Sequence, residues 1–180
     1  MEIKTDTAND ILANFGISKP SNTYDRWHRG DHFILDDFDE VLFESRYVLI
    51  IDWRAALKDE LERIASLLPD FGVSINMDFN DTGNEAVLSC GDLSEKVKYC
   101  PSDNDDFEKV ILALQRITPD LVEFRGSPLS EGADTWVFAM NGPEEWKEVD
   151  ALAPEVMDHF FRKLSGSTES IHGRPWWRFW

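Results

Sequence analysis

The stretch Tyr47–Phe79, YVLIIDWRAALKDELERIASLLPDFGVSINMDF, predicts a strand, a helix and a second strand in that order. The apolar run Tyr47–Ile51 has the composition of a strand. Alternation of apolar and polar residues over Val73–Phe79 has the period of a half-buried strand. Between them, an amphipathic stripe predicts a helix that starts at an Asp52 cap and runs to about Leu68, with Leu57, Leu61, Ile64, Ala65 and Leu68 on its apolar side. These three elements are compatible with one right-handed crossover.

The residues after Phe79 continue the sheet. Asn80–Asn84 is rich in turn-forming residues, and it precedes two strand-like segments, Glu85–Cys90 and Glu95–Cys100. A Gly91-Asp92 turn joins those segments, so a three-stranded antiparallel meander is expected. A hairpin that turns over about Gly91–Ser94 places Cys90 opposite Glu95, so the two cysteines do not oppose each other.

The C-terminal half predicts two further helices and two possible strands. Its segments are a helix over about Asp103–Ile117, strands at Leu121–Arg125 and Thr135–Met140, and a helix that starts at Pro143, breaks at Pro154 and ends near Gly166. The expected fold is therefore α+β: one domain with a mainly antiparallel or mixed sheet and about three larger helices packed on it.

The chain ends are expected to differ from this body. Thr7 can cap a short helix over Thr7–Phe15, and a turn-rich linker follows at Ser18–Thr23. We therefore predict an N-terminal helix and linker over residues 1–23, an α+β domain over 24–166, and a Trp/Arg-rich tail over 167–180. A length of 180 residues suits one domain with one hydrophobic core as the default.

The charge of the chain limits its partners. Eighteen Lys and Arg against 35 Asp and Glu give a net charge of -17, while 42% hydrophobic residues indicate a folded body. An acid excess of this size repels nucleic acids and anionic membranes and attracts basic surfaces. The longest apolar run is too short to cross a bilayer, and the acidic N-terminus lacks the layout of a signal peptide, so we expect a cytoplasmic protein with no membrane partner.

Two acidic clusters are the candidate partner-binding residues. The first is the densest acidic stretch, DHFILDDFDEVLFE, where acids interleave with apolar anchors, and its candidates are Asp31, Asp36, Asp37, Asp39, Glu40 and Glu44. The second lies at the start of a predicted helix and comprises Asp103, Asp105 and Asp106. Acids at a helix start also stabilise the free N–H groups there, and most surface acids are only solvated, so both explanations stay open.

Other candidate sites have simpler explanations. Asp78–Gly83 resembles the opening of a calcium loop, but Ser89 stands where the loop needs an acid, so a turn is the better interpretation. His28 and His32 have a zinc-compatible spacing, but Gly30 lies between them and no helical stripe accompanies them. Cys90 has acidic neighbours, which disfavour a thiolate. No catalytic residue, metal site or cofactor is therefore assigned.

The leading hypothesis is a non-enzymatic inhibitor or immunity-type protein that captures a basic protein, such as a toxin nuclease. An enzyme or small-ligand domain with a site assembled from distant residues is an alternative. The tail RPWWRFW, Arg174–Trp180, either docks on the acidic body or binds a partner, which makes an adaptor the third possibility. No motif identifies a family.

Overall fold

The computed structural model describes residues 2–17, 32–100, 107–130 and 133–164, with the backbone alone for His32 and residues 35–37. They form a single α+β domain, as the sequence predicted. The expected sheet was mainly antiparallel or mixed, and every strand pair among these residues is antiparallel. The elements in chain order are β1 (Glu2–Lys4), α1 (Thr5–Asn14), β2 (His32–Ile34), α3 (Leu35–Leu42), β3 (Val48–Asp52), α4 (Leu57–Leu67), η1 (Leu68–Phe71), β4 (Asn76–Phe79), β5 (Glu85–Cys90), β6 (Leu93–Lys98), α5 (Glu108–Ile117), β7 (Glu123–Gly126), η3 (Pro128–Ser130), β8 (Thr135–Asn141), α6 (Pro143–Leu152), α7 (Pro154–Phe160) and β9 (Arg162–Lys163).

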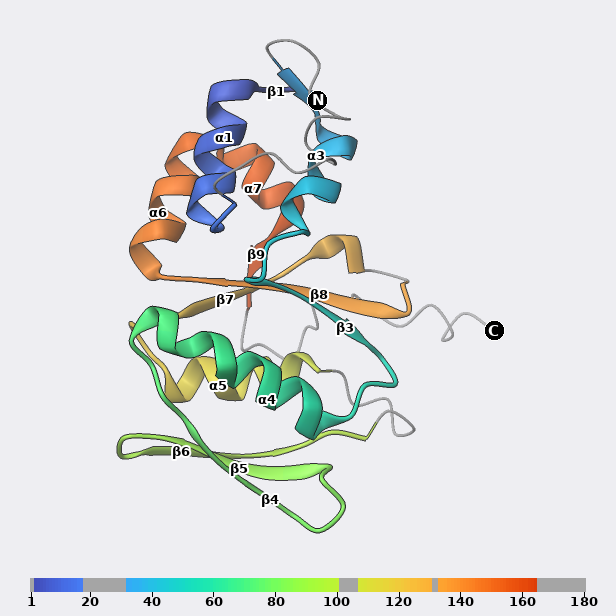
Figure 1. The fold of residues 1–180 in the computed structure, drawn as a ribbon, viewed down its shortest axis with the longest axis vertical. Coiled ribbons are helices and arrows are strands. Elements are labelled where there is room, and N and C mark those ends of the chain that lie inside the picture. The colour runs from blue at the N-terminus through green and yellow to red at the C-terminus, as the bar shows by residue number, and fades with distance from the viewer. Residues whose placement is uncertain (1, 18–31, 101–106, 131–132, 165–180) are drawn as a thin grey trace.

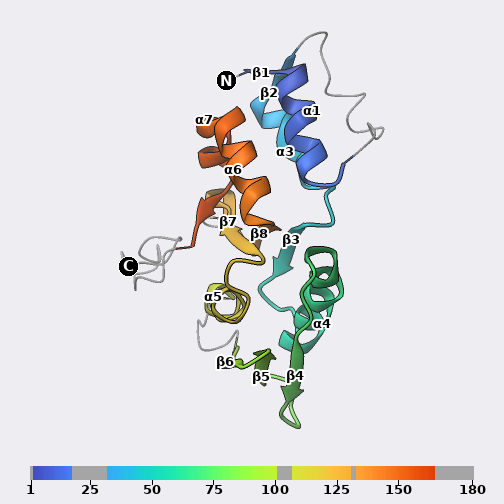
Figure 2. The ribbon, with the colours of Figure 1, turned by 90° about the vertical axis from the view of Figure 1, so that its left-hand side faces the viewer.

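A four-stranded sheet of order β3-β8-β7-β9 lies in the middle of the molecule (Figure 1). Helices α1, α3, α6 and α7 cover one face, and α4 and α5 cover the other. The three-stranded meander β4-β5-β6 lies beyond α4 and α5, so the molecule is elongated and layered (Figure 2). Successive side chains of β8 point to opposite faces of the sheet, so the strand packs against helices on both sides. Val137 and Ala139 pack on one side, and Phe138 and Met140 pack on the other.

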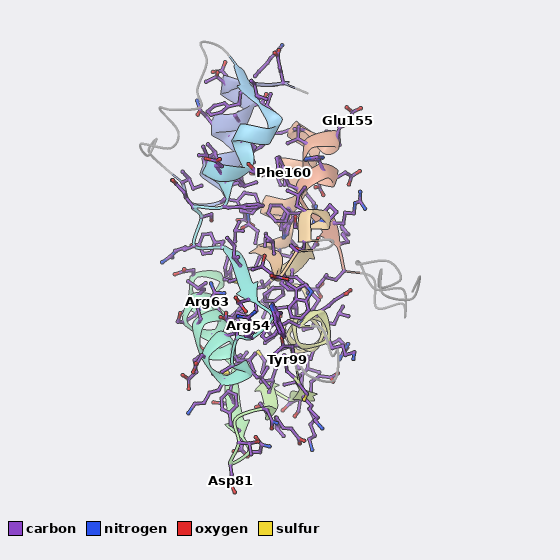
Figure 3. The ribbon with its side chains drawn as sticks, turned by 90° about the vertical axis from the view of Figure 1, so that its right-hand side faces the viewer. Arg54, Arg63, Asp81, Tyr99, Glu155 and Phe160 are labelled. Atoms are coloured by element: carbon purple, nitrogen blue, oxygen red, sulfur yellow. The ribbon has the colours of Figure 1, made fainter. Side chains whose placement is uncertain are left out.

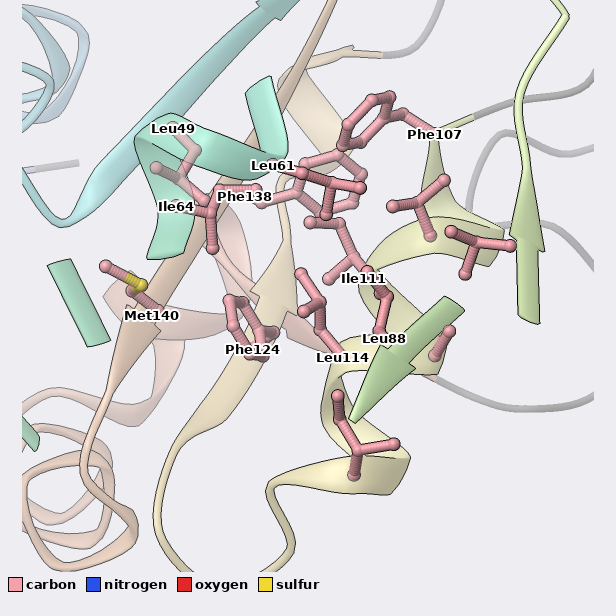
Figure 4. Close-up of a cluster of buried hydrophobic side chains, with 14 of the residues drawn as sticks. Leu49, Leu61, Ile64, Leu88, Phe107, Ile111, Leu114, Phe124, Phe138 and Met140 are labelled. Carbon is pink, nitrogen blue, oxygen red and sulfur yellow. The ribbon is translucent and has the colours of Figure 1, made fainter. Parts of the chain in front are cut away.

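Buried hydrophobic side chains form two clusters, one on each face of the central sheet. The lower cluster, named for its place in Figure 1, lies between the central sheet, α4, α5 and the meander (Figure 4). The α4 stripe predicted from the sequence supplies Leu57, Leu61 and Ile64, all buried. The meander contributes Leu88 from the inner face of β5, and Phe138 comes from the sheet above. The helix stripe and the strand alternation therefore meet in one apolar interior.

The upper cluster lies on the other face of the central sheet, between that sheet and helices α1, α3, α6 and α7. The ring of Phe15, just after α1, packs against two other rings. Its centroid lies 5.4 Å from that of Trp146 in α6 and 5.8 Å from that of Phe161. Near the N-terminus, β1 pairs with β2, and α1 packs against α6. The domain thus holds two hydrophobic clusters on opposite faces of one sheet, where the length alone suggested one core.

Three local predictions were wrong. The crossover does not form, because β3 and β4 belong to different sheets and α4 connects those sheets. Asp52 does not cap α4, which begins at Leu57; its carboxylate accepts a hydrogen bond from the backbone N–H of Arg54 instead. The last helix ends at Phe160, because Phe161 is extended and leads into β9.

Three further details differ from the sequence prediction. The meander hairpin has a two-residue turn with Gly91 at φ 56°, so Cys90 lies opposite Leu93 and not Glu95. Helix α1 starts at Thr5, directly after β1, so Thr7 lies inside it and is not its cap. The segment around Asp36, which was given no secondary structure from the sequence, contains helix α3.

Candidate functional site

Among the described side chains of helix α3, the apolar ones are buried and the acids are more exposed. Phe38, Val41 and Leu42 are fully buried in the upper cluster. Glu40 and the following Glu44 are exposed, and Asp39 is half-buried. This helical arrangement explains why acids and apolar anchors interleave in the sequence, because residues three and four apart share a face.

The side chains of the other residues in the two predicted patches lie outside the described part of the structure. Asp36 and Asp37 lie in α3, where the backbone alone is described. Asp31 and the whole second patch, Asp103, Asp105 and Asp106, lie outside the described residues. So do His28 and the tail 167–180.

The fold adds acids that sequence reasoning missed. Helices α6 and α7 lie in the same layer as α1 and α3 (Figure 1), and their exposed acids are Glu144, Glu145, Glu148, Glu155 and Asp158. Two of them, Glu144 and Glu145, follow Pro143 and lie in the first turn of α6, as the sequence predicts. The packing of α1 against α6 and of Phe38 against Phe160 brings acids from distant parts of the sequence into one layer.

We call residues 2–17, 32–44 and 142–160 the helical layer. It contains fourteen acids and two lysines, Lys4 and Lys147. Residues 45–141 contain eighteen acids and nine Lys or Arg, and residues 161–164 add Arg162 and Lys163. The helical layer is about half as long, so its negative charge is the more concentrated.

An apolar corner lies between α6 and α7 within this acidic surface. Leu152 is 44% exposed, and Ala153 ends α6 so that Pro154 starts the next helix. Exposed Glu148 and Glu155 flank the corner in sequence on either side. An exposed leucine among charges has the composition of a small binding anchor with a polar rim.

A buried arginine holds α6 onto the central sheet. Arg125 of β7 is 4% exposed, and its guanidinium lies 4.0 Å from the centre of the Trp146 ring. It donates hydrogen bonds to Asp150 at 2.6 and 2.8 Å and to Glu123 at 2.7 Å. Burial alone lowers the pKa of Arg125, but its hydrogen bonds to Asp150 and Glu123 outweigh burial and raise that pKa. These contacts attach α6, and the acids it carries, to the central sheet.

The remaining sequence candidates have structural roles. The Asn80 carboxamide oxygen accepts backbone hydrogen bonds from Asn84 and Glu85, which builds the turn that was favoured over a calcium loop. Cys90 and Cys100 are half-buried thiols. The imidazole of His159 packs edge-on against the Phe160 ring, with 4.9 Å between the ring centroids. Within the described ranges, no three His, Cys, Asp or Glu side chains gather as metal ligands would.

No protein-family model, curated protein or solved structure matches this chain. In the part of the chain that the structure describes, no helix has the length and apolar character needed to cross a membrane.

Proposed function

We propose that this protein is an acidic binding module that captures a basic protein through its helical layer, and that it acts as an inhibitor or immunity-type protein in the cytoplasm. The observation that carries this proposal is the ratio of fourteen acids to two lysines in that layer. Such a surface accelerates encounter with a cationic partner. A toxin nuclease fits, because a protein that binds nucleic acid presents a basic face.

The apolar corner at Leu152 gives this surface a means of holding a partner after encounter. Charges at the rim of an interface mainly raise the association rate, whereas a desolvated apolar anchor slows dissociation. The acids of α3 and α6 are expected to steer the partner, and Leu152 is expected to contact it. These two contributions are separable by kinetics.

The test compares two variants with equal net charge. The layer variant carries Glu40→Gln, Glu44→Gln, Glu148→Gln and Glu155→Gln, all at exposed positions of the helical layer. The control carries Asp59→Asn, Glu62→Gln, Asp78→Asn and Asp81→Asn, at exposed positions of α4 and the meander. Figure 3 places Glu155 and Asp81 toward opposite ends of the molecule.

The partner is first recovered from the source lysate at low salt and identified by mass spectrometry, then purified for kinetic measurements. The layer variant should associate about ten-fold more slowly and show a weaker salt dependence, while the control stays close to wild type. Equal effects of the two variants would mean that net charge alone acts, and no effect of the layer variant would refute the proposed surface.

A further inference from the structure

The opposite end of the molecule has a basic groove, although the chain is acidic. A hollow of about 280 Å³ lies between strand β6 and helix α5. Four cations line it: Lys96 and Lys98 from the strand, and Lys109 and Arg116 from the helix. Nearby, Glu85 pairs with both lysines of the strand, and Glu95 pairs with Arg116.

The helix wall of the groove is one continuous stripe. Lys109, Leu112, Ala113 and Arg116 are spaced three and four residues apart, so they share one side of α5. Ala113 is buried and Leu112 is half-buried. The wall therefore has a cation toward each end and a small apolar surface between them.

The strand wall of the groove is the edge of the meander. The backbone N–H of Tyr99 donates a hydrogen bond to the carbonyl of Asn84. With the β5–β6 register, this bond shows which residues of β6 direct their backbone groups toward β5. Because antiparallel ladders alternate, the backbone groups of Ser94, Lys96 and Lys98 point away from β5. No backbone hydrogen bond joins these outward groups to another described residue.

The edge of the central sheet differs from this open edge. Strand β3 is the outer strand there, and the carbonyl of Ile50 accepts a hydrogen bond from Arg63 of α4 at 3.2 Å. A side chain thus occupies the edge of β3, as natural sheets commonly arrange to prevent unwanted pairing. Strand β6 has six residues, and Lys96, Val97 and Lys98 among them line the groove.

We propose that the β6–α5 groove binds an extended acidic peptide segment of a partner protein, which adds to the meander as a fourth strand. The outward N–H and C=O groups of β6 would supply the backbone hydrogen bonds. Alternate side chains of the segment would point toward Lys96 and Lys98 on one side and toward the α5 stripe on the other. A small or apolar residue fits between Lys109 and Arg116, with acids next to it.

The charges select this occupant over a second copy of the chain. Two β6 edges that pair antiparallel would bring Lys96 and Lys98 of one copy against the same lysines of the other. Like charges opposite each other destabilise a sheet pair, whereas an acidic strand forms cross-strand ion pairs. Lysines on an edge thus exclude the chain itself and admit an acidic segment.

The test uses a fluorescein-labelled octapeptide of alternating Glu and Val, titrated with the full-length protein and followed by anisotropy. The variant Lys96→Glu with Lys98→Glu should weaken binding at least about ten-fold, since both side chains, 70% and 55% exposed, face the segment. The matched control, Lys58→Glu with Lys147→Glu, changes the net charge equally at exposed lysines elsewhere and should bind like wild type. An equal loss in both variants would overturn the site.

Two further probes test strand addition itself. Residue-resolved amide hydrogen exchange should show new protection at Ser94, Lys96 and Lys98 when the peptide is bound, and little change at Val97, whose N–H already belongs to the ladder. A peptide N-methylated at alternate residues should bind more weakly, because it lacks donors for β6. Binding without these effects would overturn strand addition. A thymidine decamer serves as a polyanion of another class, and its tighter binding than that of the peptide would overturn the acidic-peptide assignment. These outcomes are independent of the helical layer.

Discussion

The guanidinium of Arg125 and the carboxylate of Asp150 form a two-pronged ion pair, with N–O distances of 2.6 and 2.8 Å, between β7 and α6. The pair holds the acidic helix against the central sheet. Trp146, which lies under the guanidinium, also donates its indole N–H to the carbonyl of Glu123 at 2.7 Å. The same few residues therefore connect the sheet, the helix and the upper hydrophobic cluster.

Replacing Arg125 should destabilise the protein strongly. We expect Arg125→Met to lower the free energy of unfolding by about 2–4 kcal/mol, because it leaves Glu123 and Asp150 without their shared cation and removes the contact with Trp146. Arg125→Lys should recover only part of this loss, since an ammonium lacks the fork that bonds both Asp150 oxygens. Urea titrations followed by tryptophan fluorescence measure all three proteins. Equal stability of the Lys and Met variants would contradict the two-pronged role.

The pair between Arg116 and Glu95 predicts a pH dependence. The hydrogen bond from Arg116 holds the pKa of the Glu95 carboxyl below its ordinary value. A carboxyl with a lowered pKa in the folded state stabilises the protein above the ordinary pKa, and this contribution disappears as pH falls through the folded-state pKa. Arg116→Gln should therefore be less stable than wild type near neutral pH, and the difference should vanish in acid.

Urea titrations of both proteins at several pH values between about 7 and 3 measure this difference. Lys58→Gln is the control, because it removes one charge from an exposed pair on another helix, with an N–O distance of 3.7 Å. Its stability difference from wild type should be small at all pH values. A constant gap between Arg116→Gln and wild type across the range would show that the ionised Glu95 does not contribute.

The elements that the sequence predicted are those with a strong local pattern. The α4 stripe, strand Glu85–Cys90 and the Pro143 helix start are visible in the residues themselves, and the structure confirms them. Helix α3 was missed because its acids and apolar residues were considered as a charge cluster and not by helical spacing. The crossover failed because pattern alone does not say which strands share a sheet.

The candidate site was only partly predictable for the same reason. Glu40 and Glu44 belong to a dense local cluster, so composition finds them. Glu148 and Glu155 join their layer through contacts between α1 and α6, which lie more than 100 positions apart in the chain. The basic groove likewise depends on the pairing of β6 with β5 and the packing of α5 beside β6, and its four cations are scattered in the sequence.

The two hydrophobic clusters should unfold together, because they share the central sheet. Phe15→Ala removes a ring from the upper cluster and Phe138→Ala one from the lower, both fully or almost fully buried. Each should lower the free energy of unfolding by about 3–5 kcal/mol. Tryptophan fluorescence and far-UV circular dichroism should give coincident urea transitions in both variants. Separate transitions would show that the two clusters are independent folding units.

Two glycines with the same backbone conformation provide a matched comparison. Gly16 has φ 73° and Gly72 has φ 72°, both in the left-handed region where a side chain is strained. A Cβ at Gly16 would lie 3.0 Å from Cε2 of Tyr47, whereas a Cβ at Gly72 would meet no atom within 4 Å.

Gly72→Ala should therefore lower the free energy of unfolding by about 1 kcal/mol through backbone strain alone. Gly16→Ala adds a close contact with a ring that itself packs on Phe71, and it should lower that free energy by about 2–3 kcal/mol. The double variant Gly16→Ala with Tyr47→Leu separates the two effects, because a smaller residue at position 47 removes the contact and leaves the strain. Urea titrations of the four variants, including Tyr47→Leu alone, complete the cycle. Additive losses from Gly16→Ala and Tyr47→Leu would show that the ring does not restrict position 16.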